Sequence, residues 1–143
     1  MKQAHVVLIA ILGIAVAGCN RLGSSANDLQ ALQGTWTMVE TTYNGQPQPG
    51  KMQWVVEGNQ YRIRVDQGLS PDPYQFTLDT EHRRIDVFHH DTPPGTFGGK
   101  LKGIYKLSGD SLTVCYDLTA TRYPDSYKAP AGSRRVVYQF RRQ

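Results

Sequence analysis

The sequence predicts an all-β protein, an eight-stranded antiparallel up-and-down barrel preceded by a short helical turn. First, apolar and polar residues alternate from Gly34 almost to the C-terminus of the 143-residue chain, as in half-buried strands. Second, the composition of 14 Gly, 8 Pro and 8 Tyr favours strands and turns over helices. Third, no amphipathic helix separates two strand segments, which indicates an antiparallel meander and not parallel βαβ units.

The first residues are typical of a secretory signal. Lys2 precedes an unbroken apolar run from Val6 to Ala17, which is shorter than the ~20 residues that a membrane-spanning helix needs. The run ends in Val16-Ala-Gly-Cys19, which resembles the lipobox of bacterial lipoproteins. We therefore expect residues 1–18 to be a cleaved signal peptide and Cys19 to be lipidated. The alternative is an ordinary secretory signal with a cysteine near its cleavage site.

Lipidation of Cys19 would determine where the protein resides. Two or three acyl chains, palmitate among them, would hold it at a membrane, because each buried CH₂ contributes ~0.8 kcal/mol. Asn20 follows the cysteine, which resembles the sorting signal of outer-membrane lipoproteins in enteric bacteria. We expect a protein of the bacterial cell envelope, on the periplasmic or surface face. Residues 19–26 would be the lipidated cysteine and a flexible tether, and residues 27–143 the barrel domain.

The charge of the chain is weakly positive and spread out. The formal net charge is +4, and removal of Lys2 leaves the mature chain only mildly basic. The arginines come as separated pairs: Arg83–Arg84, Arg134–Arg135 and Arg141–Arg142. Because nucleic-acid binding needs basic residues gathered on one face, we expect no nucleic-acid partner.

Periodicity places the elements in order. A helical turn is expected over residues 27–33, where Leu29 and Leu32 share one side. Alternation then predicts strands at 35–43, 52–57, 60–66, 74–79, 84–89, 101–108, 111–117 and 134–141. Turn residues separate these strands, and two longer loops cover 91–100 and 118–133. If Cys19 is lipidated, Cys115 has no disulfide partner, and we expect it to act as a small buried hydrophobe.

The segment Gly34-Thr35-Trp36 resembles the Gly-x-Trp signature of lipocalin and calycin barrels. The wider pattern is similar to an uncharacterised lipocalin-like domain family expanded in planctomycete bacteria. The matching pieces are residues 32–40, 44–46, 103–117 and the closing Phe-Arg-Arg. The resemblance implies that Trp36 plugs one end of the barrel, with Arg141 or Arg142 across its ring. It implies no particular activity.

Seven aromatic residues on predicted strand faces are candidates for lining a ligand cavity. They are Tyr61, Tyr74, Phe76, Tyr105, Tyr116, Tyr138 and Phe140. The alternative is that these rings simply fill a small barrel, whose interior has room for side chains or for one small ligand.

The one grouping of metal-ligand residue types is His82, His89, His90 and Asp91. Adjacent histidines in a strand point to opposite faces, so His89 and His90 cannot both join one zinc site. We expect no metal, no cofactor and no catalytic residues. The sequence thus favours a monomeric, non-enzymatic binding module for a small apolar ligand or an envelope protein. The alternatives are a structural envelope lipoprotein without ligand and a metal-dependent enzyme using the His82–Asp91 region.

Overall fold

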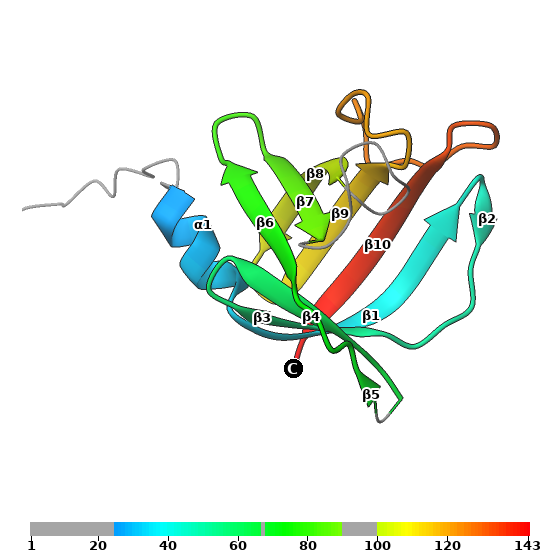
Figure 1. Ribbon diagram of the computed structural model, residues 1–143. Helices are drawn as coiled ribbons and strands as arrows, with labels where there is room; N and C mark the ends of the chain where they lie inside the picture. The colour runs from blue at the N-terminus through cyan, green and yellow to red at the C-terminus, as the bar shows by residue number, and fades with distance from the viewer. Residues whose placement is uncertain (1–24, 67, 90–99) are drawn as a thin grey trace, which may run out of the picture.

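A helix and ten strands follow one another in the computed structural model, which describes residues 25–66, 68–89 and 100–143 (Figure 1). The helix, α1 (Ser25–Leu32), begins two residues before the predicted turn. The strands are β1 (Gly34–Tyr43), β2 (Gln46–Pro47), β3 (Gln53–Glu57), β4 (Gln60–Val65), β5 (Gly68–Leu69), β6 (Tyr74–Asp79), β7 (Arg84–His89), β8 (Lys100–Ser108), β9 (Ser111–Asp117) and β10 (Arg135–Arg142).

Eight of these strands form a closed antiparallel barrel. They pair in the order β10-β9-β8-β7-β6-β4-β3-β1, and β1 also pairs with β10 along its length, which closes the sheet. The two-residue strands β2 and β5 pair only with β1 and β4. The prediction of an all-β, eight-stranded antiparallel barrel with a short N-terminal helical turn is therefore confirmed.

Because neighbouring strands run in opposite directions, the connections between them lie alternately at the two ends of the barrel. The closed end carries α1, the C-terminus and the short β3–β4, β6–β7 and β8–β9 turns. The other end, called here the open end, is where β1, β4, β7 and β9 finish. In Figure 1, α1 and the β3–β4 turn lie on the left, and β2 and β5 on the right.

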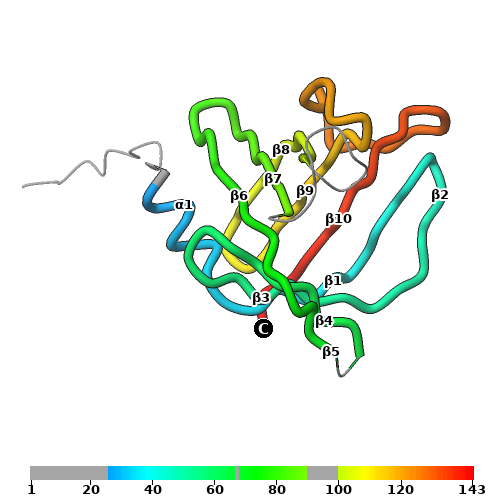
Figure 2. Tube along the Cα trace, in the orientation of Figure 1, coloured from blue at the N-terminus to red at the C-terminus, as the bar shows by residue number. Residues whose placement is uncertain are grey.

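Toward the open end, two pairs of neighbouring strands, β1 with β3 and β4 with β6, are hydrogen-bonded over only part of their length. Strand β1 pairs with β3 only over its first four residues, and the following segment swings away before it returns as β3 (Figure 2). Strands β4 and β6 share only two register pairs, Gln60 with Gln75 and Tyr61 with Tyr74. A bulge at Val39, which is 59% exposed, interrupts the register of β1 with β10 between Met38 and Glu40. The open half is consequently less tightly closed than the other half.

The loop at 118–134 packs on the outside of the barrel. Its Ala129 is buried against Cys115 and Val137, whose side chains point outward from β9 and β10. Tyr127 Oη donates a hydrogen bond to the Tyr105 carbonyl at 2.8 Å, and Gly45 N donates to the Ala129 carbonyl at 2.6 Å. The loop therefore covers the outer face of β8, β9 and β10.

Candidate functional site

The closed end is built around Trp36. This residue is 0% exposed, and the guanidinium of Arg142 lies 4.3 Å from the centre of its ring. Gly34 lies beneath the same guanidinium, with a φ of 105° that favours glycine. Arg141 is exposed on the other face of β10, opposite Thr37. Of the two C-terminal arginines, Arg142 is the one that covers the tryptophan.

The same residues satisfy the last carbonyls of α1, which a helix leaves without partners. Trp36 Nε1 donates to the Leu32 carbonyl at 2.8 Å. Arg142 donates to the carbonyls of Ala31 and Gln33, and the Gln33 amide donates to the Leu29 carbonyl. A cation is also favourable at the negative end of the helix dipole. These bonds fix α1 across the end of the barrel and seal it.

Tyr105 belongs to this sealed half of the barrel. Tyr105 is 0% exposed, and its Oη donates to Asp28 Oδ2 on α1 at 2.6 Å. Arg83 Nη1 contacts the same oxygen at 2.6 Å. Burial, followed by the neighbouring Asp28 carboxylate, raises the pKa of the Tyr105 phenol well above its usual range. Tyr105 therefore helps to attach α1 to the barrel, and the expectation that Tyr105 and Phe76 line a ligand cavity stays a prediction.

The interior next to this plug is filled. A cavity of about 10 Å³ lies among nine apolar and aromatic side chains, which is room for no more than one water molecule. Its lining is Leu32, Trp54, Val56, Tyr61, Phe76, Ile85, Tyr105, Leu112 and Val114. In this half the aromatic residues fill the barrel.

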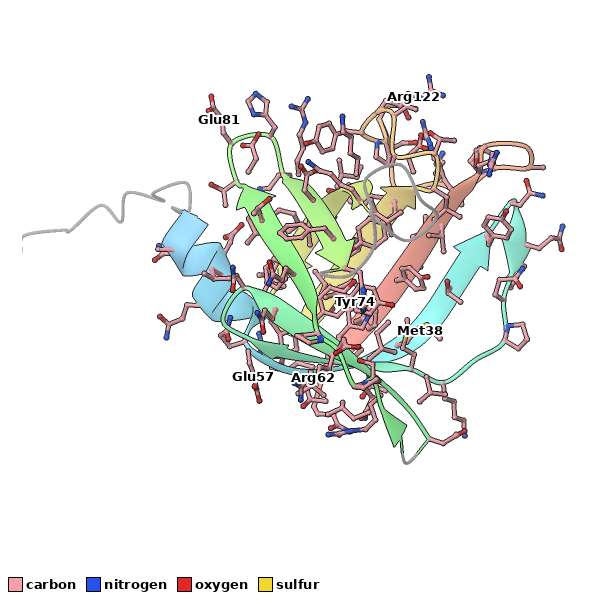
Figure 3. The ribbon with its side chains drawn as sticks, in the orientation of Figure 1. Met38, Glu57, Arg62, Tyr74, Glu81 and Arg122 are labelled. Carbon is pink, nitrogen blue, oxygen red and sulfur yellow. The ribbon has the colours of Figure 1, made fainter. Side chains whose placement is uncertain are left out.

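Inward-facing residues become accessible toward the open end. Tyr138 shares its face of β10 with the buried Phe140, yet Tyr138 itself is only partly buried. Tyr74, which stacks on the buried Tyr61 and lies between β6 and β10 in Figure 3, is partly buried as well. Tyr74 and Tyr138 are therefore the partly exposed members of an inward-facing aromatic set whose other members are buried.

We call these inward-facing aromatic residues the aromatic cup. Its members are Trp54, Tyr61, Tyr74, Tyr116, Tyr138 and Phe140. The ring centres of Trp54 and Tyr61 are 4.3 Å apart and those of Tyr61 and Tyr74 are 5.2 Å apart, with interplanar angles of 20° and 12°. Three rings thus form one stack along the β3–β4–β6 wall, and β9 and β10 supply the facing rings.

Trp54 Nε1 is a buried hydrogen-bond donor without a partner among the described residues, whereas the buried Tyr116 hydroxyl has the Tyr61 hydroxyl as its neighbour. Trp54 is 4% exposed and Tyr116 is 2% exposed. The Tyr116 ring lies directly on Gly103, where an added Cβ would come within 2.5 Å of it. A buried donor without a partner, such as Trp54 Nε1, is uncommon in folded proteins and costs free energy of folding.

The cup disfavours negative charge. Burial, followed by the neighbouring phenols, raises the pKa values of Tyr61, Tyr116 and Tyr138. Other inward-facing residues of the open half carry no fixed charge, namely Met38, Thr41, Ile63, Leu101 and Val136. His89 meets the Tyr74 ring edge-on at 5.1 Å at the rim. The arrangement suits an apolar, uncharged molecule.

The histidines do not gather into a metal site in the described part of the chain. His82 pairs with Asp79 at 2.9 Å in the β6–β7 turn, whereas His89 ends β7 at the opposite end of the barrel. His90 and Asp91 lie outside the described residues. Over 25–66, 68–89 and 100–143, no three His, Cys, Asp or Glu side chains are placed to hold a metal ion.

Cys19 and the apolar run before it also lie outside the described residues. Within the described ranges no helix has the length and apolar character needed to cross a membrane. Cys115 is buried, and its burial raises the pKa of the thiol to about 11. That environment suits a packing role more than a reactive one.

Trp54 is the member of the cup that sequence reasoning missed. Its alternation with Met52 and Val56 places it on an inward face, and this signal was present in the sequence. The fold and the site define a small closed antiparallel barrel with one sealed end and one aromatic cup. Comparison of the chain with family models, with curated proteins and with solved structures finds no match.

Proposed function

We propose that this protein is a non-enzymatic binding module, held at a membrane by lipidated Cys19, that takes a small, largely apolar ligand at the open end of its barrel. The observation that carries the proposal is the change in burial along the interior. Trp36, Tyr105 and Phe140 are at most 1% exposed, whereas the inward-facing Tyr74 and Tyr138 are half-buried. A cup with an aromatic floor and an apolar wall is a common form of ligand site.

The positions of α1 and of the aromatic cup at opposite ends of the barrel support the proposed attachment. The segment that contains Cys19 joins the described chain at Ser25, the first residue of α1, and α1 packs across the closed end. The cup opens at the other end of the barrel. An anchor at Cys19 is therefore compatible with a cup that stays accessible while the protein is held at a surface.

Buried or paired carboxylates in the described chain have structural partners away from the cup. Asp28 binds Tyr105 and Arg83, Asp86 binds Tyr123 and Lys100, and Asp117 binds Thr119. Asp79 pairs with His82, and Asp125 with Arg135. In these contacts the carboxylates stabilise turns and hold loops and α1 against the barrel. For this reason we propose binding and not catalysis.

Ligand binding is tested with N-phenyl-1-naphthylamine, an uncharged probe that fluoresces in apolar surroundings. The protein is the full chain carrying Cys19→Ser, and the test variant adds Tyr138→Glu, which places a charge in the cup. Gln139→Glu is the matched control, because Gln139 is exposed on the outer face of the same strand. We expect probe binding to fall at least about 10-fold in the first variant, since a buried charge is costly, and to persist in the control.

The absence of probe binding to the parent protein, or equal loss in both variants, would contradict binding in the cup. Thermal unfolding of each variant, followed by circular dichroism, shows that the barrel is intact at the temperature of the assay.

The anchor is tested separately in cells fed radiolabelled palmitate. We expect label on the parent chain and none on Cys19→Ser, because only the cysteine thiol can carry the thioether. Cys115→Ser is the control, since Cys115 is buried in the barrel wall. Persistent labelling of Cys19→Ser would show that the protein is not lipidated at this residue.

A further inference from the structure

We propose that a cleft in the barrel wall binds a single-chain amphiphile whose head carries one negative charge, as the carboxylate of a fatty acid does. The cleft has a volume of about 360 Å³, and its lining comes from β1, from residues 51–53 and from the end of β4. This volume is within the ~300–1,000 Å³ of small-molecule sites. The cleft lies where β1 and β3 diverge toward the open end, so the inference rests on the proposed function and specifies the class of its ligand.

Two methionine side chains form the apolar part of the cleft. Met38 lies opposite the buried Phe140 in the register of β1 and β10, and Met52 alternates with the buried Trp54. Both methionines therefore face the interior, where they pack against the core and stay partly exposed. Figure 3 labels Met38 beside the ribbon of β1. Methionine is unbranched and flexible, so its side chain adapts to an alkyl chain laid against it.

Exposed aliphatic residues border the same cleft. Val39 and Val65 are chain neighbours of lining residues, and Leu69 lies opposite Arg64 in the register of β4 and β5. They are three of the five large apolar side chains that are exposed within the described ranges. Exposed apolar residues gathered around one hollow are typical of a binding surface.

Arg64 and Lys51 provide positive charge for a head group. Arg64 Nη1 donates to Gln53 Oε1 at 3.2 Å, and Gln53 Nε2 donates to Thr37 Oγ1 at 3.1 Å. These two bonds hold the guanidinium at the cleft, while its Nε and Nη2 have no partner in the described part of the chain. Lys51 makes no ion pair with any described residue. A guanidinium donates two parallel hydrogen bonds to a carboxylate, which is the head group that this arrangement fits.

Asp66 limits the charge of the head to one. Its carboxylate lines the cleft with the two cations, so the three charged side chains together carry one net positive charge. A single negative charge is balanced there, whereas a second one would meet the repulsion of Asp66. The other large groove, of about 410 Å³ between α1 and β6, has no charged side chain in its lining and would not distinguish head groups by sign.

The head and the chain of such a ligand have separate places. Arg64 lies on the outer face of β4, because it alternates with the inward-facing Ile63. Inside the barrel, the buried phenols of the aromatic cup disfavour negative charge. The head is therefore held at the outer wall, and the chain lies along Met38 and Met52.

Three amphiphiles with one decyl chain test the head group on the full chain carrying Cys19→Ser. They are decanoate, decyltrimethylammonium and decyl maltoside, with a negative, a positive and an uncharged head. Isothermal titration calorimetry below the micelle concentrations gives the affinity of each one. We expect decanoate to bind most tightly, because it alone complements the net charge of the cleft.

Two arginine variants locate the head group. Arg64→Gln should lower the affinity for decanoate about 10-fold, as the loss of a charge-assisted hydrogen bond would. Arg62→Gln is the matched control, since Arg62 lies on the same face of β4 but does not line the cleft. It removes the same charge and should change the affinity by less than about 2-fold, because exposed charges outside the site are screened. Asp66→Asn should raise the affinity for decanoate, and decyl maltoside should bind all three variants alike.

Methyl-labelled methionine locates the chain of the ligand by NMR. The sequence has three methionines, Met1, Met38 and Met52. Addition of decanoate should shift the methyl signals of Met38 and Met52, which line the cleft. Met1 precedes the apolar run from Val6 to Ala17, so its signal reports amphiphile that binds to that run.

Each failure has a different meaning. If neither the amphiphiles nor N-phenyl-1-naphthylamine binds, the proposed function itself is wrong. If the naphthylamine binds in the cup but decanoate does not bind, the function stands and the cleft assignment is overturned. The assignment is also overturned if decyl maltoside binds as tightly as decanoate, if Arg64→Gln and Arg62→Gln lose affinity equally, or if only the signal of Met1 shifts.

Discussion

The guanidinium of Arg142 lies 4.3 Å from the centre of the Trp36 ring and also binds two carbonyls at the end of α1. This one side chain therefore joins the last strand, the first strand and the helix. Because β1 and β10 are the pair that closes the barrel, the contact stabilises closure at the point where the two chain ends of the domain meet.

We expect Arg142→Ala to lower the free energy of unfolding by about 2–3 kcal/mol, from the lost cation–π contact and the lost charged hydrogen bonds. Its ion pair with Asp110 at 3.3 Å adds little, because the Asp110 side chain is largely exposed. Arg141→Ala is the control and should change stability by less than about 0.5 kcal/mol. Urea unfolding followed by tryptophan fluorescence measures both. Equal losses would show that Arg142 has no special role.

A second prediction concerns Gly103 beneath the cup. A Cβ there would lie 2.5 Å from the Tyr116 ring and 2.9 Å from the Cys115 carbonyl, so both a side chain and the backbone would have to move. We expect Gly103→Ala to destabilise the fold by about 1–3 kcal/mol. Gly68→Ala is the matched control, since its Cβ would meet nothing closer than 3.6 Å. Equal thermal midpoints for the two variants would contradict the close packing of Tyr116.

The Cys115 thiol should be unreactive in the folded protein. Its pKa is raised from 9.0 to about 11 by burial, which lowers the thiolate fraction at pH 8 roughly 100-fold. In the Cys19→Ser chain we expect iodoacetamide to modify Cys115 at least that much more slowly in buffer than in urea. Mass spectrometry of timed samples measures the two rates. Similar rates in buffer and urea would mean that this part of the barrel wall opens readily.

The fourth prediction is loss of stability in alkali. The pKa values of Tyr61 and Tyr116 are raised above the ordinary 10.0, mainly by burial, so the folded protein holds phenol protons that the unfolded chain releases. Stability is thus fully present below about pH 10 and is lost as the pH rises above it. Each such tyrosine contributes a slope of about 1.4 kcal/mol per pH unit.

Tyr116→Phe should reduce this slope, because it removes a buried phenol whose pKa is raised by burial. Tyr43→Phe, at an exposed tyrosine, should leave the slope unchanged. Urea unfolding at pH 8 to 11 measures these effects. An unchanged slope in Tyr116→Phe would contradict the prediction.

The sequence also predicts which residues of the last strand face the barrel interior. Tyr138 and Phe140 share an inward face, and the same period-two alternation places Arg142 inward and Arg141 outward. The strands β2 and β5 could not be predicted in this way, because two residues are too few to show an alternation.

By itself, the sequence determined the class of fold, because each strand carries its own alternation and short turns leave adjacent strands no pairing but an antiparallel one. It also placed the aromatic residues on the inward faces. Only the tertiary structure showed which of those residues pack at the closed end with Trp36 and which belong to the aromatic cup. Whether an inward ring is covered depends on its height in the barrel and on where β1, β3, β4 and β6 separate. These properties arise from pairing between distant segments, and no local pattern contains them.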